Sequence, residues 1–186
     1  MLKNYVQRLE PPDVIMACQW GILSLMALDA EQLKRLIRQA FESVKLGEGI
    51  GLWEAQAIDD YEPPKIRKER RARDQTESWQ NIPDEDLRQC ESSLSFFDAA
   101  GMRFHIPAFM IAEINGNSSV GPIYSLTDLF DYTLEQFAAL SDPQRNAVSE
   151  FLLYLDSLEP EGFDRERIQK ALADYWVLPR PSEAKD

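Results

Sequence analysis

The fold is decided by the stretch WQNIPDEDLRQCESSLSFFDAAGMRFHIPAFM, which runs from Trp79 to Met110. Large apolar side chains are dense in this stretch, and each aromatic side chain buries a large area when it packs. Gly101 and Pro107 fix where the chain bends between these side chains. The stretch also holds His105, the only histidine of the chain. We therefore expect these residues to form the middle of a hydrophobic core.

The length and composition predict one globular domain. The chain has 186 residues, of which 44% are hydrophobic, enough for a single continuous core. Its formal net charge of −12, from 20 Lys and Arg against 32 Asp and Glu, disfavours binding to bulk nucleic acid or to anionic lipid. Cys18 and Cys90 form no C-x-x-C pair, so neither a disulfide framework nor a thiolate metal site is expected. We expect a reducing, cytoplasmic location.

The segment Val14–Leu28 is almost continuously apolar, with Gln19 and Ser24 as its polar interruptions. It is shorter than the roughly 20 residues that span a bilayer, so no membrane partner is expected. Its flanks do not match those of a signal peptide. Another interpretation is that Met26 is the natural start. We accordingly expect residues 1–25 to be an N-terminal extension, 26–180 to be one α-helical domain and 181–186 to be a tail.

Helix signals begin at Asp29, where Gln32 three residues later completes the pattern of a capping box. Apolar side chains then recur at helical spacing, and we expect this helix to end at Gly47. The glycines at 47, 49 and 51 lack the preceding strand and the Gly-Lys-Ser/Thr ending of a nucleotide-binding loop, which favours a helix end and a turn. Further helices are expected over residues 52–61, 64–73, 83–94, 107–114, 141–158 and 164–176, with capping boxes at Thr133 with Gln136 and at Ser141 with Gln144.

One short segment reads as extended. Met102, Phe104 and Ile106 alternate with two polar residues, a period of two that is typical of a strand, and Pro107 then suits the first position of a new helix. The predicted fold class is therefore mainly α: a single-domain multi-helix bundle with at most one or two short extended segments. The side chains expected to share its core are Leu36, Phe41, Leu87, Phe97, Phe104, Phe109, Phe151, Leu155 and Trp176.

Three blocks of the sequence carry a family resemblance. They are Leu52–Tyr61, Trp79 with Ile82-Pro83, and Phe96–Phe109, and the helix Ser141–Leu155 adds to them. The chain resembles, from about Asp29 to Leu158, a family of uncharacterised bacterial proteins classed as a domain of unknown function. This resemblance implies no activity, cofactor or catalytic residue.

His105 is the candidate for acid or base chemistry, because the free imidazole has a pKa near neutrality. Arg103 would share its face if the segment is extended, and the acids in a similarly apolar setting are Glu54, Asp59 and Asp60. No cofactor is expected. A zinc site is not expected either, because histidine and cysteine pairs are absent, and the acids lack the D-x-D-x-D-G spacing of a calcium loop.

The helix expected after Pro63-Pro64 is strongly basic. It carries six basic residues against one acid, a charge of +5 that leaves −17 for the rest of the chain. Pairs at i, i+4 are expected between Glu69 and Arg73 and between Arg70 and Asp74. Stacking aromatics do not accompany this helix, which favours an intramolecular role or a protein partner over nucleic acid. The candidate partner-binding residues are Arg67, Lys68, Arg70, Arg71 and Arg73.

Two functional hypotheses follow. The first is a small acidic cytoplasmic interaction or regulatory module, including an inhibitor or immunity-type protein that occupies a partner's surface, which requires no catalytic residue. The alternative is a hydrolase-like enzyme built around His105 with Arg103 and one of the three acids. An enzyme needs these groups within hydrogen-bond reach at the wall of one pocket, whereas an interaction module does not.

Overall fold

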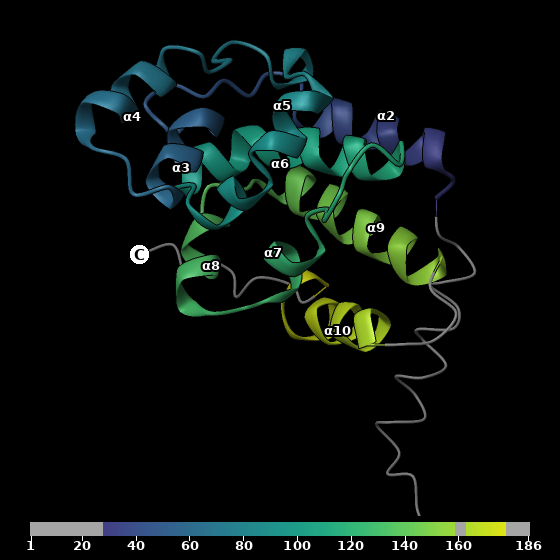
Figure 1. Cartoon of the computed structure of the whole chain (residues 1–186). Helices are drawn as coiled ribbons and strands as arrows, with labels where there is room; N and C mark the ends of the chain where they lie inside the picture. The colour runs from purple at the N-terminus through teal and green to yellow at the C-terminus, as the bar shows by residue number, and fades with distance from the viewer. Residues whose placement is uncertain (1–27, 159–162, 178–186) are drawn as a thin grey trace, which may run out of the picture.

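The computed structural model describes residues 28–158 and 163–177, and these residues form a mainly α-helical fold (Figure 1). They contain no β-strand, so the predicted fold class is confirmed. The expected extension at residues 1–25 and the expected tail at 181–186 lie outside the described residues. The α-helices are α2 (Ala30–Ala40), α3 (Leu52–Asp59), α4 (Pro64–Arg71), α5 (Asp84–Gln89), α6 (Ala99–Ile114), α7 (Ile123–Thr127), α8 (Asp131–Gln136), α9 (Asp142–Leu158) and α10 (Phe163–Ala171). Two short 3₁₀ helices, η1 (Trp79–Asn81) and η2 (Glu91–Ser95), flank α5, and one π-helical turn, η3 (Leu172–Trp176), follows α10.

Helix α6 is the centre of the fold. It packs against α2, α5, α8 and η1, and Figure 1 shows it running through the middle of the molecule. Its N-terminus is capped by Asp98, whose side chain accepts hydrogen bonds from Gly101 N at 2.7 Å and from Ile50 N at 3.0 Å. A helix that is apolar on every side is a buried helix, and α6 is of this kind.

The prediction of an extended segment at Met102–Ile106 was wrong, because these residues are helical and belong to α6. The alternation that suggested a strand was incomplete, since His105 is as buried as its apolar neighbours. A helix buried on all sides shows no period of 3.6, so the short pattern around Arg103 imitated a period of two. Pro107 lies inside the helix rather than at its start, with its ring buried in the core.

Helix α2 begins as predicted and ends earlier. Asp29 accepts a hydrogen bond from Gln32 N at 2.8 Å, and the Gln32 side chain accepts one from Asp29 N at 3.1 Å, which confirms the capping box. The helix stops at Ala40 rather than at Gly47. The carbonyl of Phe41 accepts a hydrogen bond from Trp79 Nε1 at 2.9 Å, which replaces the helical hydrogen bond that continuation of α2 would have required.

The other two predicted capping boxes had different outcomes. Ser141 N donates to Gln144 Oε1 at 3.0 Å and α9 begins at the next residue, so this start is close to the prediction. Thr133 does not open a helix, because α8 already begins at Asp131. Gln136 instead donates to the carbonyl oxygens of Leu94 and Phe97 and ties α8 to the chain before α6.

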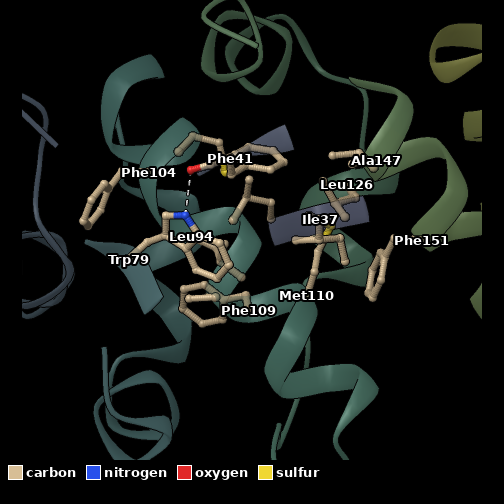
Figure 2. Close-up of a cluster of buried hydrophobic side chains, with 14 of the residues drawn as sticks. Ile37, Phe41, Trp79, Leu94, Phe104, Phe109, Met110, Leu126, Ala147 and Phe151 are labelled. Carbon is tan, nitrogen blue, oxygen red and sulfur yellow. Dashed lines mark hydrogen bonds between the residues drawn. The ribbon is translucent and has the colours of Figure 1, made fainter. Parts of the chain in front are cut away.

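One hydrophobic cluster joins the helices (Figure 2). Figure 2 shows Phe104 and Trp79 on the left of the view and Phe151 on the right, with Phe41, Phe109 and Met110 between them. Seven of the nine predicted core side chains are buried in this cluster, and the other two, Leu36 and Leu155, are partly buried and pack against it. Among the described helices, none combines the length and the apolar character needed to cross a bilayer.

Candidate functional site

The start of helix α3 is capped by a residue that is distant in the sequence. Gly51 occupies the N-cap position and has no side chain to offer. Asp74, which follows α4, instead accepts hydrogen bonds from Trp53 N at 2.7 Å and from Glu54 N at 3.4 Å. A Cβ atom on Gly51 would lie 1.9 Å from Asp74 Oδ2, so the glycine makes room for this carboxylate.

Arg71 joins the same group of charges. Its guanidinium lies 3.3 Å from Glu54 and 3.7 Å from Asp74, whose side chain is fully buried, and it donates to the carbonyl of Gly47 at 3.1 Å. Burial raises the pKa of Asp74 to about 6, against the backbone donors of Trp53 and Glu54 and the charge of Arg71, which lower it. The cluster joins α3 to α4, two helices that pack closely.

His105 is fully buried in α6, next to this cluster. Its ring is stacked on Phe97, with ring centroids 4.4 Å apart, and Phe104 meets its edge. Nδ1 lies 2.7 Å from the carbonyl oxygen of Gly101. A carbonyl can only accept, so Nδ1 carries the proton and Nε2 of the neutral ring is an acceptor. Nε2 has no hydrogen-bond partner in the described part of the chain.

The environment of His105 keeps the imidazole neutral. Burial lowers its pKa to about 4, with a smaller contribution from the charge of Arg71, against the hydrogen bond to Gly101 and the charge of Asp98, which raise it. A base with such a low pKa accepts protons weakly near neutral pH. His105 can therefore act as a hydrogen-bond acceptor more readily than as a general base.

A small pocket lies between the start of α3, the loop after α4, the start of α5 and the middle of α6. Its volume is 260 Å³. Trp53 forms part of the wall, and its Nε1 donates to Asp86 Oδ2 at 3.2 Å. The lining residues are Leu52, Trp53, Arg73, Asp74, Gln75, Asn81, Ile82, Pro83, Asp86 and His105. We call this the His105 pocket.

The structure separates His105 from most of its expected catalytic partners. The Arg103 side chain donates to Gln144 Oε1 at 3.1 Å, on the side of α6 that faces α9, and does not line the His105 pocket. Glu54 pairs with Arg71. Asp60 is exposed and accepts a hydrogen bond from Gln56, and Asp59, at the end of α3, is not part of the pocket wall either.

The basic residues of α4 and its C-terminal flank have partners within the protein. Arg67 Nε donates to the carbonyl of Glu62 at 2.7 Å, and Arg71 binds Glu54 and Asp74. The guanidinium groups of Arg70 and Arg73 lie 5.6 and 3.7 Å from the centre of the Trp53 ring. Lys68 is exposed to solvent. In the described residues, the expected pairs between Glu69 and Arg73 and between Arg70 and Asp74 do not form, because Asp74 turns toward α3.

Sequence reasoning missed the two acids that line the same pocket as His105. The sequence predicts a helical pair of Asp74 with Arg70, and Asp86 lies in the first turn of α5, where an acid is favourable by itself. The one local signal for Asp74 was indirect. Gly51 stands before a helix whose N-terminus needs a cap, and glycine cannot supply a side-chain oxygen.

The described residues near the pocket offer neither a reactive thiolate nor a metal-binding group. Burial raises the pKa of the Cys90 thiol to about 12, and the charges of Asp86 and Asp74 act in the same direction, so the thiol remains protonated. In residues 28–158 and 163–177, no three His, Cys, Asp or Glu side chains are grouped so that they could hold a metal ion. The site therefore offers hydrogen bonding and charge rather than an activated nucleophile.

We expect the buried histidine to make stability depend on pH. The folded-state pKa of about 4 is below the ordinary histidine value of 6.5, so the unfolded chain binds more protons between these pH values. Stability from His105 is thus present above about pH 6.5 and is lost as the pH falls toward about 4. His105→Phe keeps the stacked ring and removes this titration. The free energy of unfolding of the variant should therefore improve relative to wild type as the pH falls through this window.

Urea denaturation at pH steps from 7 to 4 would measure this difference. Asp74 contributes to the pH dependence of stability with the opposite sign, because its raised pKa makes the folded state bind the extra proton. This contribution is the same in the wild type and in His105→Phe. If the free energies of unfolding of the two proteins changed in parallel over the whole pH range, this would contradict the buried neutral state of His105.

The fold and the site together define an acidic, mainly α-helical protein with one buried neutral histidine at a small polar pocket. The chain belongs to the Family of unknown function (DUF6714), whose model matches residues 29–179. This confirms the resemblance seen in the sequence and extends it past α9 to the end of the described residues. No curated protein and no solved structure matches the chain.

Proposed function

We propose that this protein is a small acidic interaction module that binds a basic protein partner through an apolar face between α8 and α10. This face surrounds a hollow of 660 Å³. Its apolar side chains are Leu129, Phe130, Leu134, Ala171 and Tyr175. We call it the Phe130 face. In Figure 1, α8 and α10 lie on the opposite side of the molecule from α4 and α5.

The exposure of Phe130 is the observation that carries this proposal. Its side chain is 70% exposed at the edge of the hollow, although phenylalanine is among the residues most often buried. A second hollow, of 420 Å³, is lined by Val120, Tyr124 and Leu158, which are also exposed. Arg167 connects the two hollows, since it lines the first and lies over the Tyr124 ring. Contiguous exposed apolar surface of this kind is typical of protein-interaction sites.

The floor of the Phe130 face is held rigidly. Arg145 donates to the hydroxyl and to the carbonyl oxygen of Tyr175, at 2.7 and 3.1 Å, and its guanidinium lies over the same ring. Trp176 donates to the carbonyl of Leu126 at 2.8 Å and packs against Phe137. A surface that is already ordered loses little conformational entropy when a partner binds.

The charges around the face favour a basic partner. Asp128 pairs with Arg167, and Asp174 pairs with Lys170, so these four charges compensate each other. Glu166, which lines the hollow, has no ion pair within the described residues, and α8 beside it carries two further acids, Asp131 and Glu135. The chain as a whole carries −12, which would steer a basic protein toward it. The partner that fits is a basic surface with an apolar side chain for the hollow.

The basic helix fits this proposal as a structural element. Arg67 and Arg71 make contacts inside the protein, and Arg70 and Arg73 cover Trp53. The hydrolase alternative has less support, because Arg103, Asp59 and Asp60 do not line the His105 pocket. The proposal assumes the cytoplasm as the location, where the buried Cys90 would remain a free thiol.

We expect Phe130→Asp to weaken partner binding at least tenfold, because it removes the apolar anchor and adds a charge at an apolar contact. Proteins captured from the native host by the wild-type chain would be identified by mass spectrometry, purified and titrated against both chains. The matched control is Tyr61→Asp, since Tyr61 is 91% exposed and lies in the connection between α3 and α4, away from the Phe130 face. This control should bind as the wild type does.

Several results would contradict the proposal. One is that no captured protein binds the purified chain directly. The others are that Phe130→Asp binds the partner as tightly as the wild type, or that the Tyr61→Asp control loses binding. Concentration-dependent self-association that is abolished by Phe130→Asp would assign the face to a second copy of this chain instead. Sedimentation velocity of the wild type and of Phe130→Asp would detect this self-association.

A further inference from the structure

The His105 pocket is not used by the interaction that we propose, and one buried polar atom of its histidine is left unsatisfied by the described part of the chain. His105 Nε2 is fully buried and has no hydrogen-bond partner among the described residues. A buried acceptor without a partner costs free energy, which native structures usually avoid by binding water or a ligand. Because Nδ1 donates to Gly101, the group that satisfies Nε2 has to be a donor.

The rest of the pocket wall also favours donors and positive charge. Asp74 and Asp86 both line it. Asp74 accepts from Trp53 N and Glu54 N, whereas Asp86 accepts from Trp53 Nε1 and keeps further acceptor capacity. Arg73 is the only cationic side chain among the lining residues. His105 is neutral, and Arg71 pairs with Asp74 from outside the lining, so Asp86 is the carboxylate of the wall that has no ion pair in the described residues.

Trp53 adds a surface suited to a planar cation. The guanidinium of Arg73 lies 3.7 Å from the centre of the Trp53 ring, and a planar cation in the pocket would replace it on this indole face. Arg73 itself is exposed and forms no ion pair within the described residues. A pocket of 260 Å³ is slightly smaller than most ligand sites, so it admits only a small molecule.

We propose that the His105 pocket binds a small planar organic cation of the amidinium or guanidinium type. One N–H of the ligand donates to His105 Nε2, and the carboxylate of Asp86 balances its charge. A metal ion is a poorer occupant, because no three suitable side chains are grouped in the described residues. The geometry thus assigns a small-molecule site to a part of the fold that the interaction surface leaves unused.

Benzamidinium is the probe for this proposal, and benzoate, which has the same ring and the opposite charge, is its matched control. His105 is the only histidine of the chain, so the ¹⁵N resonances of a ¹⁵N-labelled imidazole report on it without ambiguity. We expect benzamidinium to shift the Nε2 resonance saturably in an amine-free buffer at pH 7. Benzoate should bind at least tenfold more weakly.

Variants test whether benzamidinium binds at the His105 pocket rather than elsewhere on the protein. His105→Phe and Asp86→Asn should each weaken benzamidinium binding at least fivefold, measured by calorimetry. Arg103→Gln, on the same helix but outside the pocket wall, should leave it unchanged, and so should Phe130→Asp, which distinguishes this site from the proposed interaction face. Asp86 lies near the surface end of α5, so its variant tests the site even if His105→Phe folds poorly.

The proposal would be overturned by an Nε2 resonance that does not move at saturating benzamidinium. In that case water alone satisfies Nε2. Equal affinity for benzoate, or full affinity in Asp86→Asn, would likewise overturn it, because the charge of the wall would then play no part in binding.

Discussion

Phe151→Ala is expected to lower the free energy of unfolding by about 3 to 5 kcal/mol. Phe151 is fully buried on α9, and Figure 2 shows its ring beside Met110 of α6, with Leu126 and Ala147 nearby. Truncation removes the transfer free energy of the ring and leaves a cavity that the neighbouring helices can close only in part. Helices α2 and α9 pack closely, so little room exists for either to move into the space.

Urea denaturation followed by far-ultraviolet circular dichroism would measure this effect. Phe130→Ala is the matched control, because it removes the same ring from a position that is 70% exposed. We expect this control to change the free energy of unfolding by less than about 0.5 kcal/mol. An unchanged denaturation midpoint in Phe151→Ala would remove Phe151 from the shared core.

Asp74→Ala is expected to lower the free energy of unfolding by about 2 to 4 kcal/mol. The substitution removes the side-chain oxygens that accept from Trp53 N and Glu54 N at the start of α3, and Gly51 has no side chain to replace them. It also leaves the N–H group of the buried Trp53 without its acceptor and takes from Arg71 one of its two carboxylate partners. All three losses fall in one buried cluster, so they act together.

Asp74→Asn tests the cause of this loss, because asparagine keeps an oxygen that can accept from Trp53 N. We expect the free energy of unfolding of Asp74→Asn to be at least about 1 kcal/mol higher than that of Asp74→Ala. Asp60→Ala, at the exposed C-terminal end of the same helix, serves as the control and should be nearly neutral. Equal losses in the alanine and asparagine variants would mean that the charge of Asp74, rather than its capping of α3, supports the cluster.

The Asp74 cluster and the His105 pocket explain why the basic helix looked like a binding surface in the sequence. Its arginines are spaced at one, two and three residues, so they point to several sides of a short helix. Arg71 points toward Glu54 and Asp74, and Arg73 lies over Trp53. A run of like charges shows only that the segment is polar, because the partners of each side chain depend on elements far away in the sequence.

The candidate site was only partly predictable for the same reason. His105 could be selected from the sequence because it is the only histidine and lies in an apolar stretch. Its neighbours could not, since Asp74 and Asp86 are 31 and 19 positions away and no local spacing connects them to it. The acids chosen instead, Glu54, Asp59 and Asp60, were near one another in α3, and helix geometry gives them different directions.

The sequence by itself determined the helical class, the start of α2 and most of the core. These features depend on local rules, namely the reciprocal hydrogen bonds of Asp29 with Gln32 and apolar spacing on helices with one exposed face. The tertiary structure alone decided that Met102–Ile106 is helical, that α2 stops at Ala40 and that His105, Asp74 and Asp86 line one pocket. A helix buried on every side has no periodic pattern to read, and a hydrogen bond such as that from Trp79 to Phe41 joins residues that only folding brings together.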